Sequence, residues 1–330
     1  MRVAQLGAGR IGAMHAKILS GLLEPGALVV ADVDADRARA VADAVGAESA
    51  EVGAAIAGAD ALVIAASSTA HPQLIRAGIA RGIPVFCEKP LATDLDETRR
   101  LVDEIEASGI RFQLGFQRRF DAAYREARRL VEDGSLGQIY VVRLAGHDPE
   151  PPHEAYIPQS GGIFNDFGVH DFDVTRWLTG QEVEEVYADG GVLRFPVFAK
   201  YDDVDTAVAT LRLSGGTRGI LSVTRHDPLG YDIRTELFGS GDSVTVGLGP
   251  RTPLRSLEPG VPPPPGPAWS MFIDRFQDAY EEELRAFLRV ARGEQESACT
   301  ARDGLEAVRV AVAATRSLHE HRPVRISEVA

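Results

Sequence analysis

Cysteine is scarce in this chain of 330 residues, which contains only Cys87 and Cys299. The two lie far apart and do not form the paired spacing of a metal site. Disulfides accumulate in oxidising compartments, so a chain with so little cysteine fits a reducing one. We therefore expect no metal and a cytoplasmic protein.

Positive charge is also in short supply. Lysine and arginine number 35 against 48 aspartates and glutamates, which gives a net charge of −13. This excess of negative charge repels nucleic-acid phosphate and anionic membranes, so we expect neither as a partner. The chain has no apolar run of about 18 residues that could span a membrane. Residues 1–7 have the pattern of a strand rather than a signal peptide.

Glycine, by contrast, is placed where a dinucleotide requires it. A short apolar run leads into GAGRIG, which spans Gly7 to Gly12 and includes Arg10 and Ile11, and an amphipathic segment follows. In this spacing Gly7 allows a tight turn, Gly9 lets the backbone approach a pyrophosphate, and Gly12 allows close packing of helix on strand. The start of the helix attracts the negative charge. These five residues predict a dinucleotide site.

An acid stands where the adenosine ribose would lie. A second strand over residues 27–33 carries Asp32, twenty residues after Gly12. Its carboxylate can accept hydrogen bonds from the ribose hydroxyls and repels a 2′-phosphate, so it predicts NAD rather than NADP. Asp34 and Asp36 add negative charge. The alternative is that Asp32 only caps the next helix.

Two further strands end in polar residues. Residues 61–66 and 83–87 are apolar runs typical of buried parallel strands, whose carboxyl ends face the ligand crevice of a doubly wound sheet. They predict cofactor contacts for Ser67, Thr69 and His71 after the first strand, and they place Lys89, after the second strand, in the crevice. For His71 capping of the helix from Pro72 is an equal alternative, and for Lys89 the alternative is a solvated surface lysine.

The alternation of strand and helix ends near residue 117. Residues 183–246 alternate as strands with glycine-rich turns, which indicates a mainly antiparallel sheet. Residues 147–158 carry four prolines and predict an irregular loop, and the aromatic stripe of a helix over 272–292 indicates core packing. We predict an α/β fold with a Rossmann doubly wound parallel sheet in residues 1–118. An α+β domain with a large, mainly antiparallel open sheet follows in residues 119–330.

The segment GGIFNDFGVHDFDVTRWL, residues 161–178, places Asp166 and His170 four residues apart at the start of a predicted helix. Residues at this spacing share one helix face. A carboxylate beside an imidazole is suited to proton transfer near neutral pH. Asn165 or Asp166 is also a plausible helix cap. The plainer alternative is a capping aspartate and an ordinary histidine.

The motifs together resemble the glucose–fructose oxidoreductase and inositol dehydrogenase family, Gfo/Idh/MocA, over nearly the whole chain. The resemblance rests on the segments GAGRIG (7–12), ADVD (31–34), FCEKPLA (86–92), GFQRRFD (115–121) and SGGIFNDFGVHDFDVTRW (160–177). Within the family, GFQRRFD, the loop from His147 and GYD at 230–232 are most similar to bacterial inositol 2-dehydrogenases. At Asp148 these enzymes typically have asparagine, so the acid changes the hydrogen-bond pattern.

The resemblance also implies roles for particular residues. Lys89 would hold the reacting oxygen, and Asp166 and His170 would complete the catalytic set with His170 as proton acceptor. The implied substrate contacts are Lys89, Arg118, Asp148, Asp166, His170 and Tyr231, and Glu88 and Gln117 would lie beside the nicotinamide. The expected reaction is NAD-dependent oxidation of a secondary hydroxyl of a cyclic polyol, with myo-inositol and 2-keto-myo-inositol as the expected substrate and product.

Two alternatives stay open at this stage. One is another NAD(P)-dependent sugar or polyol dehydrogenase or reductase of the same family. The other is a non-catalytic dinucleotide-binding regulator, which would be expected to lose Lys89 or His170. Inositol dehydrogenases that resemble this chain are tetramers, and an uncovered sheet face favours association. We therefore expect a homotetramer.

Overall fold

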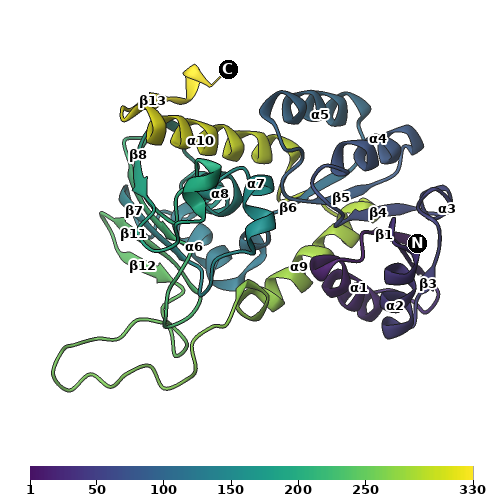
Figure 1. Ribbon diagram of the computed structural model, residues 1–330, viewed down its shortest axis with the longest axis horizontal. Coiled ribbons are helices and arrows are strands. Elements are labelled where there is room, and N and C mark those ends of the chain that lie inside the picture. The colour runs from purple at the N-terminus through teal and green to yellow at the C-terminus, as the bar shows by residue number, and fades with distance from the viewer. Residues whose placement is uncertain (330) are drawn as a thin grey trace. The chain divides into compact units, whose positions relative to one another are not determined.

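A computed structural model describes residues 1–329, which form two compact units (Figure 1). The first unit contains residues 1–120 and 278–305, and the second contains residues 121–277 and the chain from 306 onward. The chain therefore returns to the first unit with residues 278–305, which the sequence had assigned to the second domain.

The first unit is built on a parallel sheet in the order β3-β2-β1-β4-β5-β6. Its strands are β1 (Val3–Leu6), β2 (Leu28–Ala31), β3 (Glu48–Ser49), β4 (Ala61–Ile64), β5 (Val85–Glu88) and β6 (Phe112–Gly115). The order reverses between β1 and β4, so the loops after these strands border the ligand crevice of a doubly wound sheet. The predicted fold class of this part is confirmed.

Helices connect these strands. They are α1 (Arg10–Leu22), α2 (Ala35–Val45), α3 (Val52–Ala57), α4 (His71–Arg81) and α5 (Leu95–Ser108), followed by the short η1 (Gln117–Phe120). The sequence did not predict β3 and α3, because two exposed residues and a six-residue helix carry too little periodic signal.

The core of this unit explains why residues 278–305 belong to it. Helix α9 (Phe272–Arg292) contributes Leu284, Phe287 and Leu288 to one buried cluster with residues of β1, β2, β4 and β5. Phe86 and Phe287 lie with ring centroids 5.7 Å apart. The aromatic stripe of α9 is therefore core packing, as its spacing predicted.

The second unit contains a seven-stranded sheet in the order β12-β11-β7-β10-β9-β8-β13. Its strands are β7 (Ile139–His147), β8 (Val183–Gly191), β9 (Thr206–Leu213), β10 (Arg218–Thr224), β11 (Asp232–Gly239), β12 (Ser243–Val246) and β13 (Val324–Arg325). All neighbouring pairs are antiparallel except β7 and β10, which are parallel. The prediction of a mainly antiparallel sheet is confirmed.

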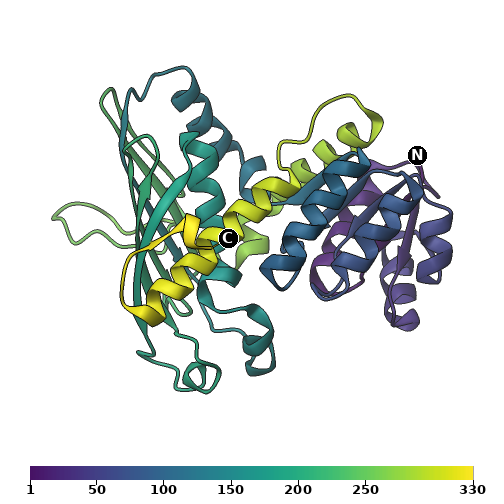
Figure 2. The same ribbon diagram turned by 90° about the horizontal axis from the view of Figure 1, so that it is seen from above.

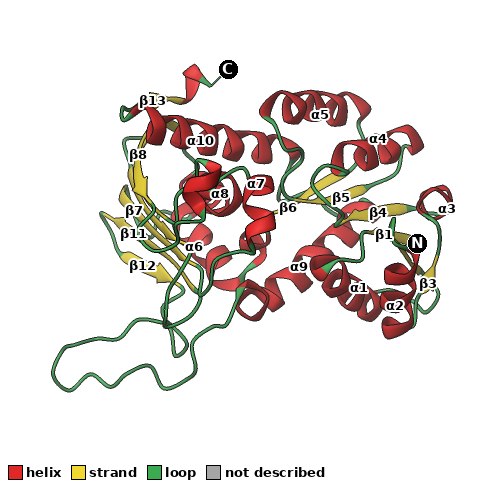
Figure 3. Ribbon diagram, in the orientation of Figure 1, coloured by secondary structure: helices red, strands yellow, loops and turns green. Residues whose placement is uncertain are grey.

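The helical elements of this unit are α6 (Ala122–Glu132), η2 (Glu154–Tyr156), α7 (Ile157–Ser160), η3 (Phe164–Gly168), α8 (Val169–Thr179), η4 (Phe198–Tyr201), α10 (Ala301–Glu320) and η5 (Ile326–Glu328). The first five residues of α10 belong to the first unit. The expected irregular loop over residues 147–158 contains η2 and the start of α7. Figure 3 shows the long loop between β12 and α9, which includes the proline-rich residues 261–267.

Figure 2 shows the seven-stranded sheet edge-on, with the helices of its own unit on one face. Along β9 the side chains alternate: Ala207, Ala209 and Leu211 are buried, whereas Val208 is 50% exposed. On the same uncovered face Ile220 of β10 is 46% exposed. One face of this sheet is therefore left without helices, as the small number of helices in this half predicted.

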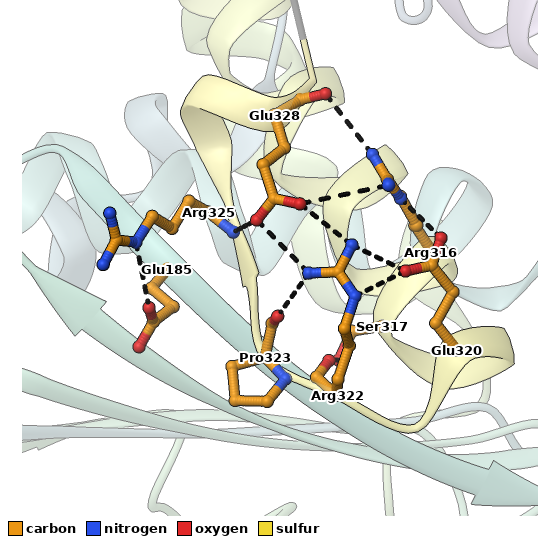
Figure 4. Close-up of polar contacts among 8 residues, drawn as sticks. All are labelled: Glu185, Arg316, Ser317, Glu320, Arg322, Pro323, Arg325 and Glu328. Carbon is orange, nitrogen blue, oxygen red and sulfur yellow. Dashed lines mark hydrogen bonds and ion pairs between the residues drawn. The ribbon is translucent and has the colours of Figure 1, made fainter.

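Near the end of the chain a network of ion pairs ties η5 to α10 and β8 (Figure 4). The carboxylate of Glu328 accepts hydrogen bonds from Arg322 Nη2 at 2.9 Å and from the backbone N–H of Arg325 at 2.9 Å. Arg325 also lies 3.7 Å from Glu185 of β8. The hydrogen bonds from Arg322, followed by that from the Arg325 backbone, lower the pKa of Glu328 to about 2. The network fixes β13 at the sheet edge.

None of the helices between residues 1 and 329 combines the length and the apolar character that a membrane span needs.

Candidate active site

The glycine loop after β1 leaves no room for side chains at two positions. Gly7 has φ +100°, and a Cβ there would lie 2.5 Å from the backbone of Ala65 and Ala66. A Cβ at Gly12 would lie 2.0 Å from the carbonyl oxygen of Gly7. Gly9 is different, because no atom lies within 4 Å of its Cβ position. The loop is thus closely packed against the sheet and open at Gly9, which fits a bound pyrophosphate.

Asp32 follows β2 and reaches the glycine loop. Its Oδ2 accepts a hydrogen bond from the backbone N–H of Ala8 at 2.6 Å, and its Oδ1 accepts one from the N–H of Asp34 at 2.9 Å. Helix α2 is capped by Asp34, which accepts from the N–H of Arg37 at 3.1 Å. The alternative that Asp32 only caps this helix is therefore wrong. Its carboxylate borders the position expected for the adenosine ribose.

The residues after β4 have two different surroundings. Ser67 and Thr69 are exposed, and their hydroxyl oxygens lie 3.2 Å apart. His71 is buried, with Nδ1 2.7 Å from the carbonyl oxygen of Pro90 and Nε2 3.1 Å from that of Ala66. Burial lowers the pKa of His71, which favours the neutral imidazole. His71 therefore ties the loops after β4 and β5 together, and its contact with the cofactor stays a prediction.

His71 does not cap α4 with its side chain. The helix begins at His71 itself, and Ala70 occupies the capping position without a side-chain hydrogen bond.

The carboxylate of Glu88, the residue before Lys89, pairs with His15 of α1. Its Oε1 lies 2.7 Å from Nε2 of His15, and His15 is fully buried. A Cβ at Gly115 of β6 would come within 3.0 Å of Glu88 Oε2. No sequence pattern predicted this pair, because His15 lies in the apolar stripe of α1 and resembles a core residue. The pair fixes the end of β5 at the point where Lys89 begins.

A second buried acid, Glu283 of α9, lies near Glu88. Glu283 is fully buried, and neither carboxyl oxygen has a hydrogen-bond partner. Its backbone carbonyl accepts a hydrogen bond from Gln113 Nε2 at 2.9 Å. Burial, and then the negative charge of Glu88, raises the pKa of Glu283 well above its ordinary value. Both effects favour the protonated, neutral form of Glu283. The only signal in the sequence was an acid beside the apolar stripe of α9.

The turn η1 contains two neighbouring buried arginines, Arg118 and Arg119. Gln117 and Arg118 are buried, and Arg118 is 2% exposed. Arg119 lies 3.1 Å from Asp303 and donates to the carbonyl oxygen of Ala298 at 2.9 Å, so it fixes the chain that returns to this unit. The roles of Gln117 toward the cofactor and Arg118 toward the substrate stay predictions.

In the second unit, Asp166 lies in η3, a π-helical segment that runs directly into α8. The predicted cap at Asn165 or Asp166 is wrong: α8 follows Gly168 without a side-chain cap, and Asn165 Nδ2 donates to Gly161 O at 2.9 Å. The wider turn continues the helix upstream, so the first N–H groups of α8 have helical partners. Segments of this kind are frequent at functional sites. His170 lies in the first turn of α8.

Asp166 has two partners that the sequence did not suggest. Its Oδ1 accepts a hydrogen bond from the hydroxyl of Tyr156 at 2.8 Å, and its Oδ2 accepts one from Arg225 Nη1 at 2.7 Å. The same nitrogen of Arg225 lies 3.7 Å from Asp148 Oδ2. The structure therefore brings together the two acids that the resemblance had implied separately, through a buried arginine that no motif contains.

Strand pairing explains this arrangement. Strands β7 and β10 are parallel with Thr224 opposite His147, and the N–H of Asp148 donates to Thr224 O at 3.0 Å. Asp148 and Arg225 therefore leave adjacent strands at the same level. Tyr231, which follows Arg225 closely in the sequence, is also buried. Its backbone N–H donates a hydrogen bond to the carbonyl oxygen of Trp269 at 2.7 Å. Its substrate contact stays a prediction.

One cluster within residues 1–329 has the ligand types of a metal site: His147, Asp227 and Asp232 offer atoms within 4.8 Å of one another. Asp232 already accepts hydrogen bonds from Arg234 Nε at 2.9 Å and Nη2 at 3.0 Å. Both carboxylate oxygens of Asp232 are therefore already engaged by a guanidinium, and we assign no metal here.

A doubly wound sheet with this glycine loop and Asp32 defines a dinucleotide-binding protein, and comparison with known families agrees. Residues 1–116 match the model of an oxidoreductase family with an NAD-binding Rossmann fold. Residues 124–245 match the GFO/IDH/MocA C-terminal domain. The chain belongs to the Gfo/Idh/MocA family of oxidoreductases, and its first unit is an NAD-binding Rossmann domain.

Individual relatives are similar over their full lengths. Myo-inositol dehydrogenase Hyg17 of Streptomyces leeuwenhoekii is 41% identical, over 96% of this chain and 97% of that protein. Myo-inositol 2-dehydrogenase of Thermotoga maritima is 36% identical, over 100% and 99%. The crystal structure of scyllo-inositol dehydrogenase from Lactobacillus casei with NAD(H) and scyllo-inositol is 28% identical, covers 99% of this chain and 98% of that chain, and has a TM-score of 0.87.

The raised pKa of Glu283 leads to a prediction about stability. Below an unfolded pKa of about 4.3 this residue is protonated in both the folded and unfolded states. Between this value and the raised folded pKa, the folded state alone keeps the proton, so the wild type loses stability as the pH rises through this window. Glu283→Gln removes this loss, and its melting temperature relative to the wild type should rise by a few degrees between about pH 5 and pH 8.

Thermal melts at several pH values measure this difference. Glu281→Gln is the matched control on the same helix, because Glu281 is half exposed and pairs with Arg285; it should show no such gain. A difference between Glu283→Gln and the wild type that does not change with pH would show that Glu283 is ionised in the folded protein.

Proposed function

We propose that this protein oxidises a secondary hydroxyl of a cyclic polyol with NAD, with myo-inositol as substrate and 2-keto-myo-inositol as product. The observation that carries the proposal is similarity over the whole chain to proteins named inositol dehydrogenases, including one solved with NAD(H) and scyllo-inositol. The paired acids of the second unit support it, because a polyol offers several hydroxyl donors to such acceptors.

The residues of the first unit fit the cofactor. Gly7, Gly9 and Gly12, with Arg10 and Ile11 at the start of α1, form the loop that would hold the pyrophosphate. Asp32 would accept hydrogen bonds from the ribose hydroxyls, and its negative charge disfavours a 2′-phosphate. When bound, NAD supplies the acceptor for the hydride. The protein itself then has to bind and orient the alcohol and accept its proton.

We propose that His170 accepts this proton, because an imidazole side chain is suited to proton transfer near neutral pH. Lys89 would stabilise the negative charge that develops on the reacting oxygen. Asp166 is a weaker candidate for the base, because both its oxygens already accept hydrogen bonds, one of them from a guanidinium. Asp166 would instead accept a hydrogen bond from a substrate hydroxyl.

The alternative is another sugar or polyol dehydrogenase of this family. A dehydrogenase screen of the wild type with myo-, scyllo- and chiro-inositol and common aldoses, each with NAD and NADP, tests between them. We expect inositol with NAD to give the highest kcat/KM. In Asp32→Ala the gap between NAD and NADP should narrow, because the phosphate repulsion is removed. Faster oxidation of an aldose, or equal efficiency with NADP, would reject the corresponding part of the proposal.

Replacing Lys89 or His170 by alanine should reduce kcat, because each acts in the chemical step. Loss of a general base typically costs about 10²- to 10⁴-fold in rate. Steady-state kinetics measure the loss, and titration with NAD should show that the cofactor still binds. If His170→Ala keeps more than about a tenth of kcat, another group accepts the proton.

We also infer that the uncovered face of the seven-stranded sheet is a subunit interface and that the protein is a homotetramer. Val208, Ile220 and Tyr187 are each at least 41% exposed on this face, and burial of apolar area favours association. Both cysteines are free and buried, which supports the prediction of a reducing, cytoplasmic setting.

Light scattering at micromolar concentration tests the interface. One chain has a mass of 35.4 kDa, and we expect the wild type to have four times this mass. Ile220→Asp places a charge on the uncovered face and should produce smaller species. Val33→Asp, on an exposed residue of the first unit, is the control and should leave the mass unchanged. A wild type with the mass of a single chain would refute the interface.

A further inference from the structure

Arg225 is a cation that the fold buries almost completely. It follows β10 directly, is 2% exposed, and donates its backbone N–H to Asp205 O at 2.8 Å. A buried charge is costly unless it is paired, so a guanidinium in this position needs acidic partners. Two such partners lie near its nitrogen Nη1: Asp166 Oδ2 at 2.7 Å and Asp148 Oδ2 at 3.7 Å.

The remaining donors of Arg225 do not serve the packing of the unit. Among the described residues, neither Nε nor Nη2 has a hydrogen-bond partner. An arginine retained only for stability would be expected to use its fork of donors fully, because an unsatisfied buried donor is destabilising. The burial of Arg225 is therefore better explained by what it does to the two acids.

The side chains of the two acids are more exposed than that of the arginine. The side chains of Asp148 and Asp166 are 21% and 14% exposed, whereas that of Arg225 is 2% exposed. A molecule that approaches this surface meets two carboxylates rather than the cation. Both acids have an oxygen near the same nitrogen, and the hydroxyl of Tyr156 fixes the other oxygen of Asp166. The acids are thus held at a set separation and orientation.

We propose that Arg225 is a positioning residue for the substrate: it fixes the carboxylates of Asp148 and Asp166 as a pair of acceptors for two neighbouring hydroxyl groups of the polyol. The proposal rests on the proposed function and narrows its substrate class to cyclic polyols with adjacent free hydroxyls. A deoxy or O-methyl derivative at either position lacks one donor, so one carboxylate loses its hydrogen bond from the substrate, which is a basis for discrimination.

The test compares Arg225→Met and Arg225→Lys with Arg218→Met. Arg218 lies at the other end of β10, is exposed, and donates to the carbonyl oxygen of Gly216. We expect Arg225→Met to lower kcat/KM for inositol by about 100-fold through misplaced acceptors. It should also weaken equilibrium binding of inositol to the NADH-bound protein. The affinity for NAD should not change, because the glycine loop belongs to the other unit.

Two further variants distinguish positioning from a merely structural role. Arg225→Lys keeps the charge and should recover part of the activity. Adding Asp148→Asn to Arg225→Met removes one of two unbalanced acids, and this double variant should bind inositol better than Arg225→Met alone. If Arg225→Met does not fold, Arg225→Lys and the double variant still decide the question.

The inference is overturned if Arg225→Met binds and oxidises inositol like the wild type, or if all its loss is accounted for by weaker NAD binding. It is also overturned if the double variant is no better than the single one. A wild type that oxidises a sugar but not inositol rejects the proposed function instead, and the same variants measured with that sugar then decide the role of Arg225.

Discussion

Backbone contact at two glycines is the constraint on which the first unit depends. A Cβ at Gly7 or Gly12 would overlap main-chain atoms at 2.0 to 2.5 Å, so no other residue allows β1, β4 and α1 to approach this closely. The same closeness places the start of α1 at the carboxyl edge of the sheet, where its free N–H groups face a ligand. Asp32 then contacts the loop through Ala8, which fixes the carboxylate beside it.

Buried charges organise the polar residues of each unit. In the first unit Glu88 pairs with the buried His15, and burial together with the charge of Glu88 raises the pKa of the neighbouring Glu283. In the second unit one buried arginine balances two acids. In each case the low polarity of the interior makes an unpaired charge expensive, so the charged side chains are held in a definite arrangement. That arrangement reaches the surface at residues implied to contact the cofactor or the substrate.

Similarity to inositol dehydrogenases identifies the reaction class, and the geometry adds what the motifs do not contain. Arg225 is absent from the segments that carry the family resemblance, and those segments implied no role for Tyr156, yet both side chains bind Asp166. His71 links the loops after β4 and β5 through contacts with two carbonyl oxygens, which no motif suggested. Lys89 follows β5 in the first unit, and Asp166 and His170 belong to the second unit.

The sequence alone determined the features that depend on local order. The glycine spacing, Asp32 after a strand, the buried parallel strands and the alternation along β9 all follow from steric limits or from periodicity within one element, so they could be predicted. Only the tertiary structure decided which distant residues meet. His15 and Glu88 are 73 residues apart, Asp166 and Arg225 are 59 apart, and the return of residues 278–305 joins α9 to the first core. No local pattern encodes such pairs, because strand order, parallel pairing of β7 with β10 and helix packing bring them together.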